Sequence, residues 1–244
     1  PALRGYEPSA QPADGDYHVV RMAEDVVGWI DALGQEGVHL VGHDWGASIG
    51  YAAAALAPER LLSLTTLAIP HPGRLQREGI RKLPSQIRNS WYTIFFQLRG
   101  LADWAVERRD WAFIERLWRD WSPGWELPAE ELAGVKATLA QPGVKRAALA
   151  YYRSAFGGRS LAAQETARLL AAPIQVPTLA LTGALDGCMD TRLHDLAMKD
   201  EDFPAGFRVA RLDAAGHFLH QEKPDEVNRI LIDWLRGPKG VHRR

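Results

Sequence analysis

Asp44 lies at the centre of the segment VGHDWG, which runs from Val41 to Gly46. Small residues two positions before and after a reactive residue are typical of a sharp turn between a strand and a helix. Gly42 and Gly46 would let the backbone turn tightly, so that the Asp44 side chain stands out above the sheet. The backbone N–H of Trp45 would then lie at a helix N-terminus, where it can stabilise an oxyanion. A simple helix N-cap explains the aspartate but not both glycines, so the pattern predicts Asp44 as a nucleophile.

A second nucleophile motif overlaps the first. Residues 46–50 read GASIG, which satisfies the serine-esterase pattern G-x-S-x-G with Ser48 at its centre. The apolar strand run ends at Val41, so Asp44 falls on the turn, whereas Ser48 falls about one turn into the next helix. For Ser48 to occupy the turn, His43 and Asp44 would have to extend a buried strand, which is unfavourable for a charge. Position therefore favours Asp44 over Ser48.

A carboxylate nucleophile selects a particular kind of substrate. Attack on an acyl group would give an anhydride, so the natural targets are electrophilic sp³ carbons that carry a leaving group. Epoxides and alkyl halides are the two obvious classes. Both would give an alkyl ester of Asp44 that water must then hydrolyse.

Hydrolysis of such an ester requires a general base, and histidine is the usual base near neutral pH. Of the eight histidines, His217 is best placed, because it follows the apolar run 207–212 and precedes the last predicted helix. His220 is a neighbouring alternative that falls in the following turn or helix. We therefore expect His217 to be the base.

The acid that orients the base should also follow a strand. Asp186 does so, directly after the apolar run 176–182, and Asp190 is the alternative. The order Asp44, Asp186, His217 along the chain is nucleophile, acid, base. Three such residues after three predicted strands indicate a catalytic triad rather than three unrelated surface groups.

Alternating strands and helices supply the positions that these residues need. Apolar runs bounded by glycine or proline predict strands over 38–41, where the strand should be buried, and over 61–69, 175–182 and 207–212. Helical spacing of apolar residues predicts helices over 17–33, 47–57 and 226–235. Strands alternating with helices predict an α/β fold with a mostly parallel sheet, which places ligands beyond the carboxyl ends of the strands.

Residues 73–172 differ from the rest of the chain. They contain most of the nine tryptophans and many arginines, and their apolar spacing is helical. We expect an α/β core formed by residues 1–72 and 173–244, with residues 73–172 inserted as a helical cap over the strand ends. Two independent domains are the alternative, but neither flanking part contains enough strands to form a core by itself.

Composition restricts the partners. The formal net charge is −1, with 46% hydrophobic and 24% charged residues, which is ordinary for a globular enzyme and does not favour nucleic acid as a partner. No apolar stretch is long enough to span a bilayer. A single cysteine, Cys188, excludes an internal disulfide and fits a reducing, cytoplasmic location. Neither a metal nor an organic cofactor is expected, because no His/Cys ligand motif is present.

These motifs together resemble those of epoxide hydrolases of the α/β-hydrolase fold, and bacterial members in particular. The matching segments are LRGY at residues 3–6, VGHDWG at 41–46, IPHP at 69–72 and GHF at 216–218. Haloalkane dehalogenases share much of this pattern, including an Asp-Trp pair like Asp44-Trp45, whose indole helps to hold the halide. The resemblance implies a small-molecule epoxide and water as substrates, and leaves a homodimer as one open assembly.

The predicted cap separates the two reactions. Epoxide opening creates an alkoxide that must be protonated, whereas a halide leaves without a proton. Epoxide hydrolases present two cap tyrosines for this step. Residues 90–97 and 148–153 are similar to the segments that carry them, which implies the roles for Tyr92 and Tyr152, with Tyr151 as the alternative to the second. A buried tyrosine with a satisfied hydroxyl is the structural alternative for each.

One family motif lies outside the sequence. Epoxide hydrolases carry a His-Gly-x-Pro turn upstream of the Arg-Gly-Tyr loop, and its backbone supplies the second oxyanion donor. The chain begins at Pro1, after that turn and after the first strands of the sheet, so we expect an exposed sheet edge. A haloalkane dehalogenase and a non-catalytic small-molecule binder are the rival hypotheses.

Overall fold

The computed structural model describes residues 1–156 and 158–237. Four parallel strands form its sheet in the order β1-β2-β3-β4. Their bounds are Val38–His43, Leu61–Leu67, Thr178–Gly183 and Phe207–Leu212. All four predicted strands and the parallel α/β architecture are confirmed, although β1 runs two residues further than expected and β2 ends two residues earlier.

Strands β2 and β3 are neighbours in space but lie far apart along the chain. Leu64 pairs with Thr178, and Leu67 pairs with Leu181. All the residues between these two strands therefore leave the sheet at the end of β2 and return to it at the start of β3. Because the strands are parallel, the segments that follow β1, β3 and β4 all begin at the same edge of the sheet.

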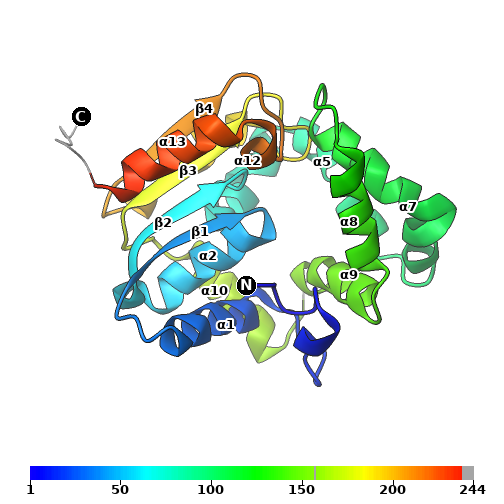
Figure 1. Cartoon of the computed structure of the whole chain (residues 1–244). Helices are drawn as coiled ribbons and strands as arrows, with labels where there is room; N and C mark the ends of the chain where they lie inside the picture. The colour runs from blue at the N-terminus through cyan, green and yellow to red at the C-terminus, as the bar shows by residue number, and fades with distance from the viewer. Residues whose placement is uncertain (157, 238–244) are drawn as a thin grey trace.

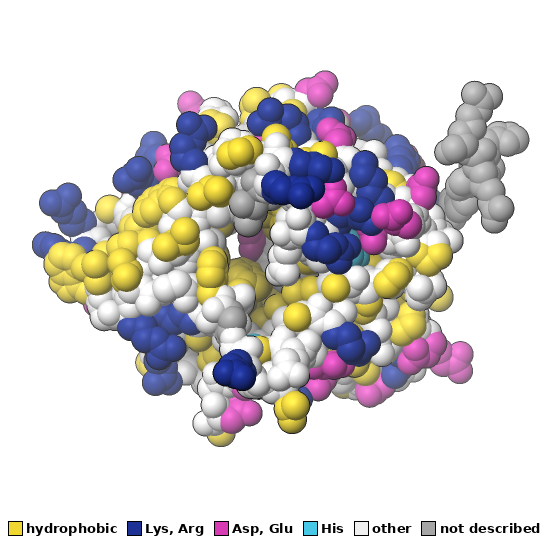
Figure 2. Space-filling view, turned by 180° about the vertical axis from the view of Figure 1, so that it is seen from behind, with side chains coloured by type: hydrophobic (Ala, Val, Ile, Leu, Met, Phe, Trp, Pro, Cys, Tyr) yellow, Lys and Arg dark blue, Asp and Glu magenta, His cyan; other side chains and the backbone are white. Residues whose placement is uncertain are grey.

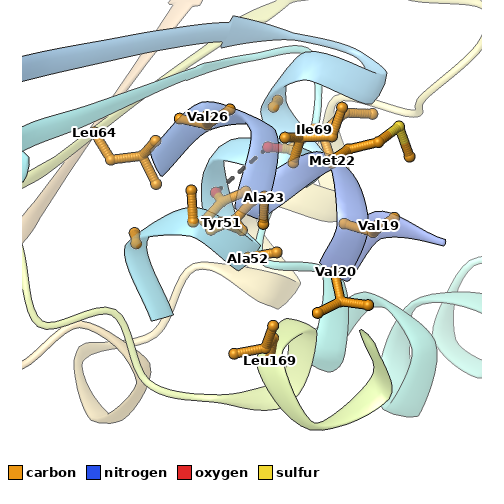
Figure 3. Packing of buried hydrophobic residues seen from close by; sticks show 14 of the residues in the cluster. Val19, Val20, Met22, Ala23, Val26, Tyr51, Ala52, Leu64, Ile69 and Leu169 are labelled. Atoms are coloured by element: carbon orange, nitrogen blue, oxygen red, sulfur yellow. Dashed lines mark hydrogen bonds between the residues drawn. The ribbon is translucent and has the colours of Figure 1, made fainter. Parts of the chain in front are cut away.

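Helices cover both faces of the sheet (Figure 1). One face carries α1 (Val19–Ala32), α2 (Trp45–Leu56) and α10 (Leu161–Ala171), and the other carries α12 (Leu219–Glu222) and α13 (Pro224–Leu235). Figure 3 shows part of the buried cluster on the first face, where Leu169 of α10 lies beside Val20 of α1. The predicted helices correspond to α1, α2 and α13.

The expectation of a buried strand over 38–41 was wrong. Side chains along β1 alternate between half-buried and exposed, and Val41 is 44% exposed. The physical reason is position, because β1 is an edge strand that pairs only with β2 among the described strands. An apolar run predicts a strand here, but it does not predict whether that strand lies at the centre or at the edge of the sheet.

Between β2 and β3 the described residues form helices and no strand. We call residues 72–171 the insertion. Its helices are α3 (Pro72–Arg74), a π-helical turn (Leu75–Gly79), α4 (Ile80–Lys82), α5 (Ser85–Asn89), α6 (Trp91–Phe95), α7 (Leu101–Trp121), α8 (Ala129–Leu139), α9 (Val144–Ala155) and α10. Helices α7, α8 and α9 stand apart from the sheet in Figure 1, whereas α10 packs on α1 and α2. The predicted domain boundaries at 72/73 and 172/173 stay a prediction.

Two further features complete the fold. Helix α7 joins two helical pieces across a kink at residues 108–111, where the backbone leaves helical geometry. The remaining elements are short: 3₁₀ turns at Pro8–Ala10, Pro58–Arg60 and Asp200–Asp202, and α11 at Arg192–Ala197.

In the described part of the chain, no helix combines the length and apolar character that crossing a bilayer requires.

Candidate active site

Asp44 occupies a strained turn between β1 and α2. Its φ of 51° and ψ of −118° lie outside the regions that a non-glycine residue prefers. Its N–H donates to the carbonyl of Leu67 at 3.2 Å, while its own carbonyl accepts the N–H groups of Ala47 and Ser48 at 3.0 and 3.1 Å. A residue held in such a conformation costs about 1–3 kcal/mol and persists only where its surroundings determine it.

Of the two glycines that flank this turn, only Gly42 is sterically required. A Cβ at Gly42 would lie 2.2 Å from the carbonyl oxygen of Gly46, which is far inside van der Waals contact. A Cβ at Gly46 would meet nothing within 4 Å. The prediction that both glycines permit the turn is therefore wrong for Gly46. The start of α2 brings the backbone of Gly46 close to Gly42, so the side chain must be absent at Gly42 but not at Gly46.

Both carboxylate oxygens of Asp44 have defined neighbours. Oδ1 accepts the backbone N–H of Trp45 at 2.6 Å, and Oδ2 lies 3.2 Å from Nε2 of His217. Burial disfavours the charged form of Asp44, but its bond to His217 and the nearby imidazoles outweigh burial and lower the pKa of Asp44. Asp44 is thus an ionised carboxylate, and its side chain is 23% exposed.

Asp186 and His217 form a buried pair behind Asp44. Nδ1 of His217 lies 2.9 Å from Oδ2 of Asp186, and both side chains are completely buried. Oδ1 of Asp186 accepts the backbone N–H groups of Cys188 and Met189, each at 2.8 Å. Burial opposes a charge on His217, but Asp186, together with Asp44, raises the pKa of His217 well above its ordinary value. The three predicted triad residues therefore lie in one hydrogen-bonded line.

The alternatives for the base and the acid lie elsewhere. Burial lowers the pKa of His220, which lies in α12, and its Nδ1 has no hydrogen-bond partner within residues 1–156 and 158–237. Asp190 pairs with Arg192, its Oδ2 at 2.5 Å, and does not contact His217 among the bonds of the described residues. Geometry thus favours His217 and Asp186 over these two neighbours.

Ser48 lies in the first turn of α2, as its position after the strand predicts. It lines a cavity that also borders Trp45 and Tyr151 on the α10 side. No hydrogen bond joins its hydroxyl to a histidine among the described residues, so Ser48 lacks the partner that a serine nucleophile requires.

Tyr92 and Tyr152 approach the site from α6 and α9. Their rings meet edge to face with centroids 5.7 Å apart, and Tyr152 meets the indole of Trp45 at 5.2 Å. Burial raises the pKa of both phenols well above the ordinary value, and the charge of Asp44 raises it further in each. Both hydroxyls therefore stay protonated at neutral pH and are able to donate a proton or a hydrogen bond.

Tyr151, the alternative to Tyr152, faces another way. Its hydroxyl donates to the carbonyl of Arg4 at 2.6 Å, and its ring is buried against Tyr6 and Tyr17. The geometry therefore favours Tyr152 over Tyr151 as the second tyrosine of the site. Residues adjacent on a helix diverge by about 100°, and here that angle directs Tyr151 to the N-terminal loop.

Three residues near the site carried no predicted role. Tyr6 borders a cavity that Tyr152 also lines, and burial and the charge of Asp44 raise the pKa of Tyr6. The indole of Trp121 packs on His217 with centroids 5.3 Å apart. Sγ of Cys188 lies 3.3 Å from the hydroxyl of Tyr92. The LRGY segment was a signal for Tyr6, but no sequence pattern separates Trp121 or Cys188 from ordinary core residues.

A cavity of about 520 Å³ is lined by Tyr152 and other residues of the insertion, and by Tyr6. Aromatic and aliphatic side chains form most of its wall, among them Phe96, Trp118, Trp121, Leu149 and Tyr152. From behind, the surface shows an opening near its middle, with hydrophobic side chains to its left and below it (Figure 2). Volume and lining suit an apolar molecule of small organic size.

Comparison with known proteins agrees with this geometry. A family model described as alpha/beta hydrolase fold matches residues 1–224. The chain belongs to this family, and its fold is that of an α/β-hydrolase.

Its relatives within the family include named epoxide hydrolases. The chain is 30% identical to epoxide hydrolase 3 of Xenopus tropicalis, covering 99% of this chain and 64% of that protein. It is 29% identical to epoxide hydrolase A of Mycobacterium tuberculosis, covering 97% and 81%. The chain thus spans slightly less than two thirds of the length of the first of these relatives.

Solved structures similar to this chain also include epoxide hydrolases. An epoxide hydrolase of Bacillus megaterium in complex with an inhibitor is 28% identical, with a TM-score of 0.76 over 93% of this chain and 78% of the other. A variant of an epoxide hydrolase from the same organism, complexed with its naphthyloxy-propane-diol product, has a TM-score of 0.78 at 28% identity and covers 96% and 82%.

Proposed function

We propose that this protein is an epoxide hydrolase that converts an epoxide to a vicinal diol. The observation that carries the proposal is the pairing of Asp44, backed by His217, with two protonated tyrosines, Tyr92 and Tyr152. A nucleophile for carbon and proton donors for an alkoxide are the two requirements of epoxide opening. The names of the relatives support the same activity.

In the first step, Oδ2 of Asp44 attacks an epoxide carbon and the C–O bond of the ring breaks. Tyr92 or Tyr152 donates its proton to the oxygen that leaves, which gives a hydroxyl group rather than a free alkoxide. Oδ1 becomes the carbonyl oxygen of the alkyl ester and keeps its bond to the N–H of Trp45. The low pKa of Asp44 keeps the nucleophile ionised at neutral pH.

In the second step, His217 removes a proton from water, which attacks Cγ of the ester. Negative charge develops on Oδ1, where the N–H of Trp45 stabilises it. The Cγ–Oδ2 bond breaks and the diol leaves with Oδ2, which takes the second proton of the attacking water. His217 keeps the first proton and so returns to its protonated resting form. Asp44 regains its carboxylate with one oxygen from water.

Ester formation removes the charge of Asp44 and thereby changes the pKa of His217. In the resting site, two carboxylates hold His217 protonated. Esterification removes the charge of Asp44 and with it one of the interactions that raise the pKa of His217. The pKa of His217 falls in the intermediate, so the imidazolium gives its proton to the tyrosinate through the product or water and becomes a base only when there is an ester to hydrolyse.

Substitution of His217 by glutamine tests this proposal. His217→Gln should let the ester form but not break down, so a styrene-type epoxide should increase the mass of the protein by one substrate, and peptide mapping should find the addition on Asp44. Asp44→Asn provides the matched control, which should take up no adduct. Halide release from alkyl halides without diol from epoxides would instead favour a dehalogenase. Binding without any adduct or turnover would favour a non-catalytic binder.

A further inference from the structure

Three metal-ligating atoms converge at the site although no sequence spacing links them. The ligand atoms of Asp44, Cys188 and His217 all lie within 4.8 Å of one another. They come from the loops that follow β1, β3 and β4, so only the closed sheet brings them together. A tetrahedral zinc ion separates its nitrogen, oxygen and sulfur ligands by roughly 3.3–3.8 Å. Small side-chain rotations would bring these three into that range.

We infer that Asp44, Cys188 and His217 form an inhibitory binding site for Zn²⁺, in which the ion occupies the position of the proposed reaction and blocks it. The ion would bind Oδ2 of Asp44, Sγ of Cys188 and Nε2 of His217, with water as the fourth ligand. Binding would replace the thiol proton of Cys188 and the Nε2 proton of protonated His217 by the metal and release both protons to solvent, while water leaves the hydrated ion. Metal binding does not depend on the proposed function, whereas the inhibition does.

The surroundings of His217 favour a metal at Nε2. Its other nitrogen, Nδ1, is held by Asp186 at 2.9 Å. A carboxylate behind a histidine fixes the ring and makes the free nitrogen a better ligand, and this arrangement is common around zinc in proteins. The pair that would prepare His217 as a base therefore also prepares it as a ligand.

Charge and softness select the ion. A thiolate and a carboxylate together cancel the charge of a divalent cation, so the loaded site would be neutral in a place where an unpaired charge is unfavourable. Thiolate and imidazole ligands suit zinc, whereas magnesium and calcium prefer oxygen ligands. Zn²⁺ should therefore bind and Mg²⁺ should not.

Only one of the three proposed ligands is partly exposed. Cys188 and His217 are buried, whereas the side chain of Asp44 is 23% exposed. We therefore expect the ion to reach the site past Asp44.

Spectroscopy of the Co²⁺-loaded protein tests the site without reference to activity. Cys188 is the only cysteine, so a thiolate-to-cobalt charge-transfer band can come from no other residue. The band should appear with one equivalent of Co²⁺ and disappear when Zn²⁺ is added. Cobalt bound without this band, or no bound cobalt at all, would overturn the proposal.

Affinity measurements on variants complete the test. Cys188→Ala and Cys188→Ser should each weaken Zn²⁺ binding about 100-fold, since even the loss of an outer-shell partner weakens metal binding roughly 10- to 100-fold. His39→Gln removes an exposed histidine of β1 and should bind zinc like the parent. Equal affinity in all four proteins would assign the zinc to surface groups and sink the proposal.

Inhibition is measured last and separately. With an active enzyme, Zn²⁺ should suppress diol formation, a chelator should restore it, and Mg²⁺ should have no effect. The half-inhibitory concentration should rise about 100-fold in Cys188→Ser, each variant being compared with its own uninhibited rate. An active enzyme that binds cobalt through Cys188 yet resists Zn²⁺ would overturn the inhibition. A protein that shows the cobalt band but has no epoxide activity would instead contradict the proposed function.

Discussion

The backbone carbonyl of Trp121 accepts the N–H of His217 at 3.1 Å, so the end of α7 is tied directly to the predicted base. The same carbonyl accepts the N–H of Gly187 at 3.0 Å, next to the predicted acid, Asp186. One peptide group of the insertion therefore sets the spacing between the loops that follow β3 and β4.

Glu222 reinforces this junction and should act as a positioning residue. It accepts the hydroxyl of Ser122 and the N–H of Gly216, both at 2.7 Å. Glu222→Ala leaves the Gly216 N–H without its partner, which should lower the free energy of unfolding by about 1–3 kcal/mol. It should also slow ester hydrolysis more than ester formation, because His217 loses its position. Denaturant unfolding and rapid-quench kinetics measure the two effects.

Two variants make this prediction specific. Glu222→Gln keeps an acceptor for Gly216 and should restore most of the hydrolysis rate. Glu226→Ala removes an exposed acid of α13 and should change neither quantity. Equal slowing of both chemical steps in Glu222→Ala would indicate a general loss of structure instead of a positioning role.

The two tyrosines should act on ester formation alone. Loss of both hydroxyls in Tyr92→Phe/Tyr152→Phe should slow formation of the Asp44 ester by about 10²–10⁴-fold, because proton donation to the leaving oxygen is lost. Single-turnover mass spectrometry measures this step. Tyr151→Phe, which loses only a bond to the Arg4 carbonyl, should form the ester far faster than the double variant. An unimpaired double variant would contradict the proposed proton donors.

The two chemical steps should respond differently to pH. Ester formation needs ionised Asp44, whose pKa is lowered, and protonated tyrosines, whose pKa is raised. It should therefore change little between about pH 5 and about pH 9, which lie between these groups' pKa values. Ester hydrolysis needs neutral His217 and should rise with pH through the pKa of His217 in the intermediate. Burst kinetics across this range separate the steps, and hydrolysis that slows with increasing pH would contradict His217 as the base.

The turn at Asp44 gives a prediction of stability. Gly42→Ala places a methyl group 2.2 Å from the Gly46 carbonyl, so the backbone must shift, at a cost of about 1–3 kcal/mol in unfolding free energy. Gly46→Ala has open space and should change stability by less than about 1 kcal/mol. Chemical denaturation compares the two, and equal losses would show that the steric difference has no effect on stability.

Local signals sufficed for the strands, the main helices and the position of Asp44. Apolar runs of strand length, glycines at the turn and helical spacing depend on neighbours in sequence, and these can be interpreted without a structure. The choice of Asp44 over Ser48 was of this kind, because it depended only on where a strand ends. The interpretation of Gly46 failed because a backbone contact across the turn cannot be recognised from residue type.

The sequence by itself determined the order of the predicted nucleophile, acid and base, and the kind of chemistry that a carboxylate nucleophile would allow. Only the tertiary structure decided which of two adjacent tyrosines faces the site, how exposed β1 is, and that Cys188 lies beside Asp44 and His217. The physical reason is the range of the interactions. Periodicity and turn preferences act over a few residues, whereas the site is assembled from loops that the parallel sheet brings to one edge from positions more than a hundred residues apart.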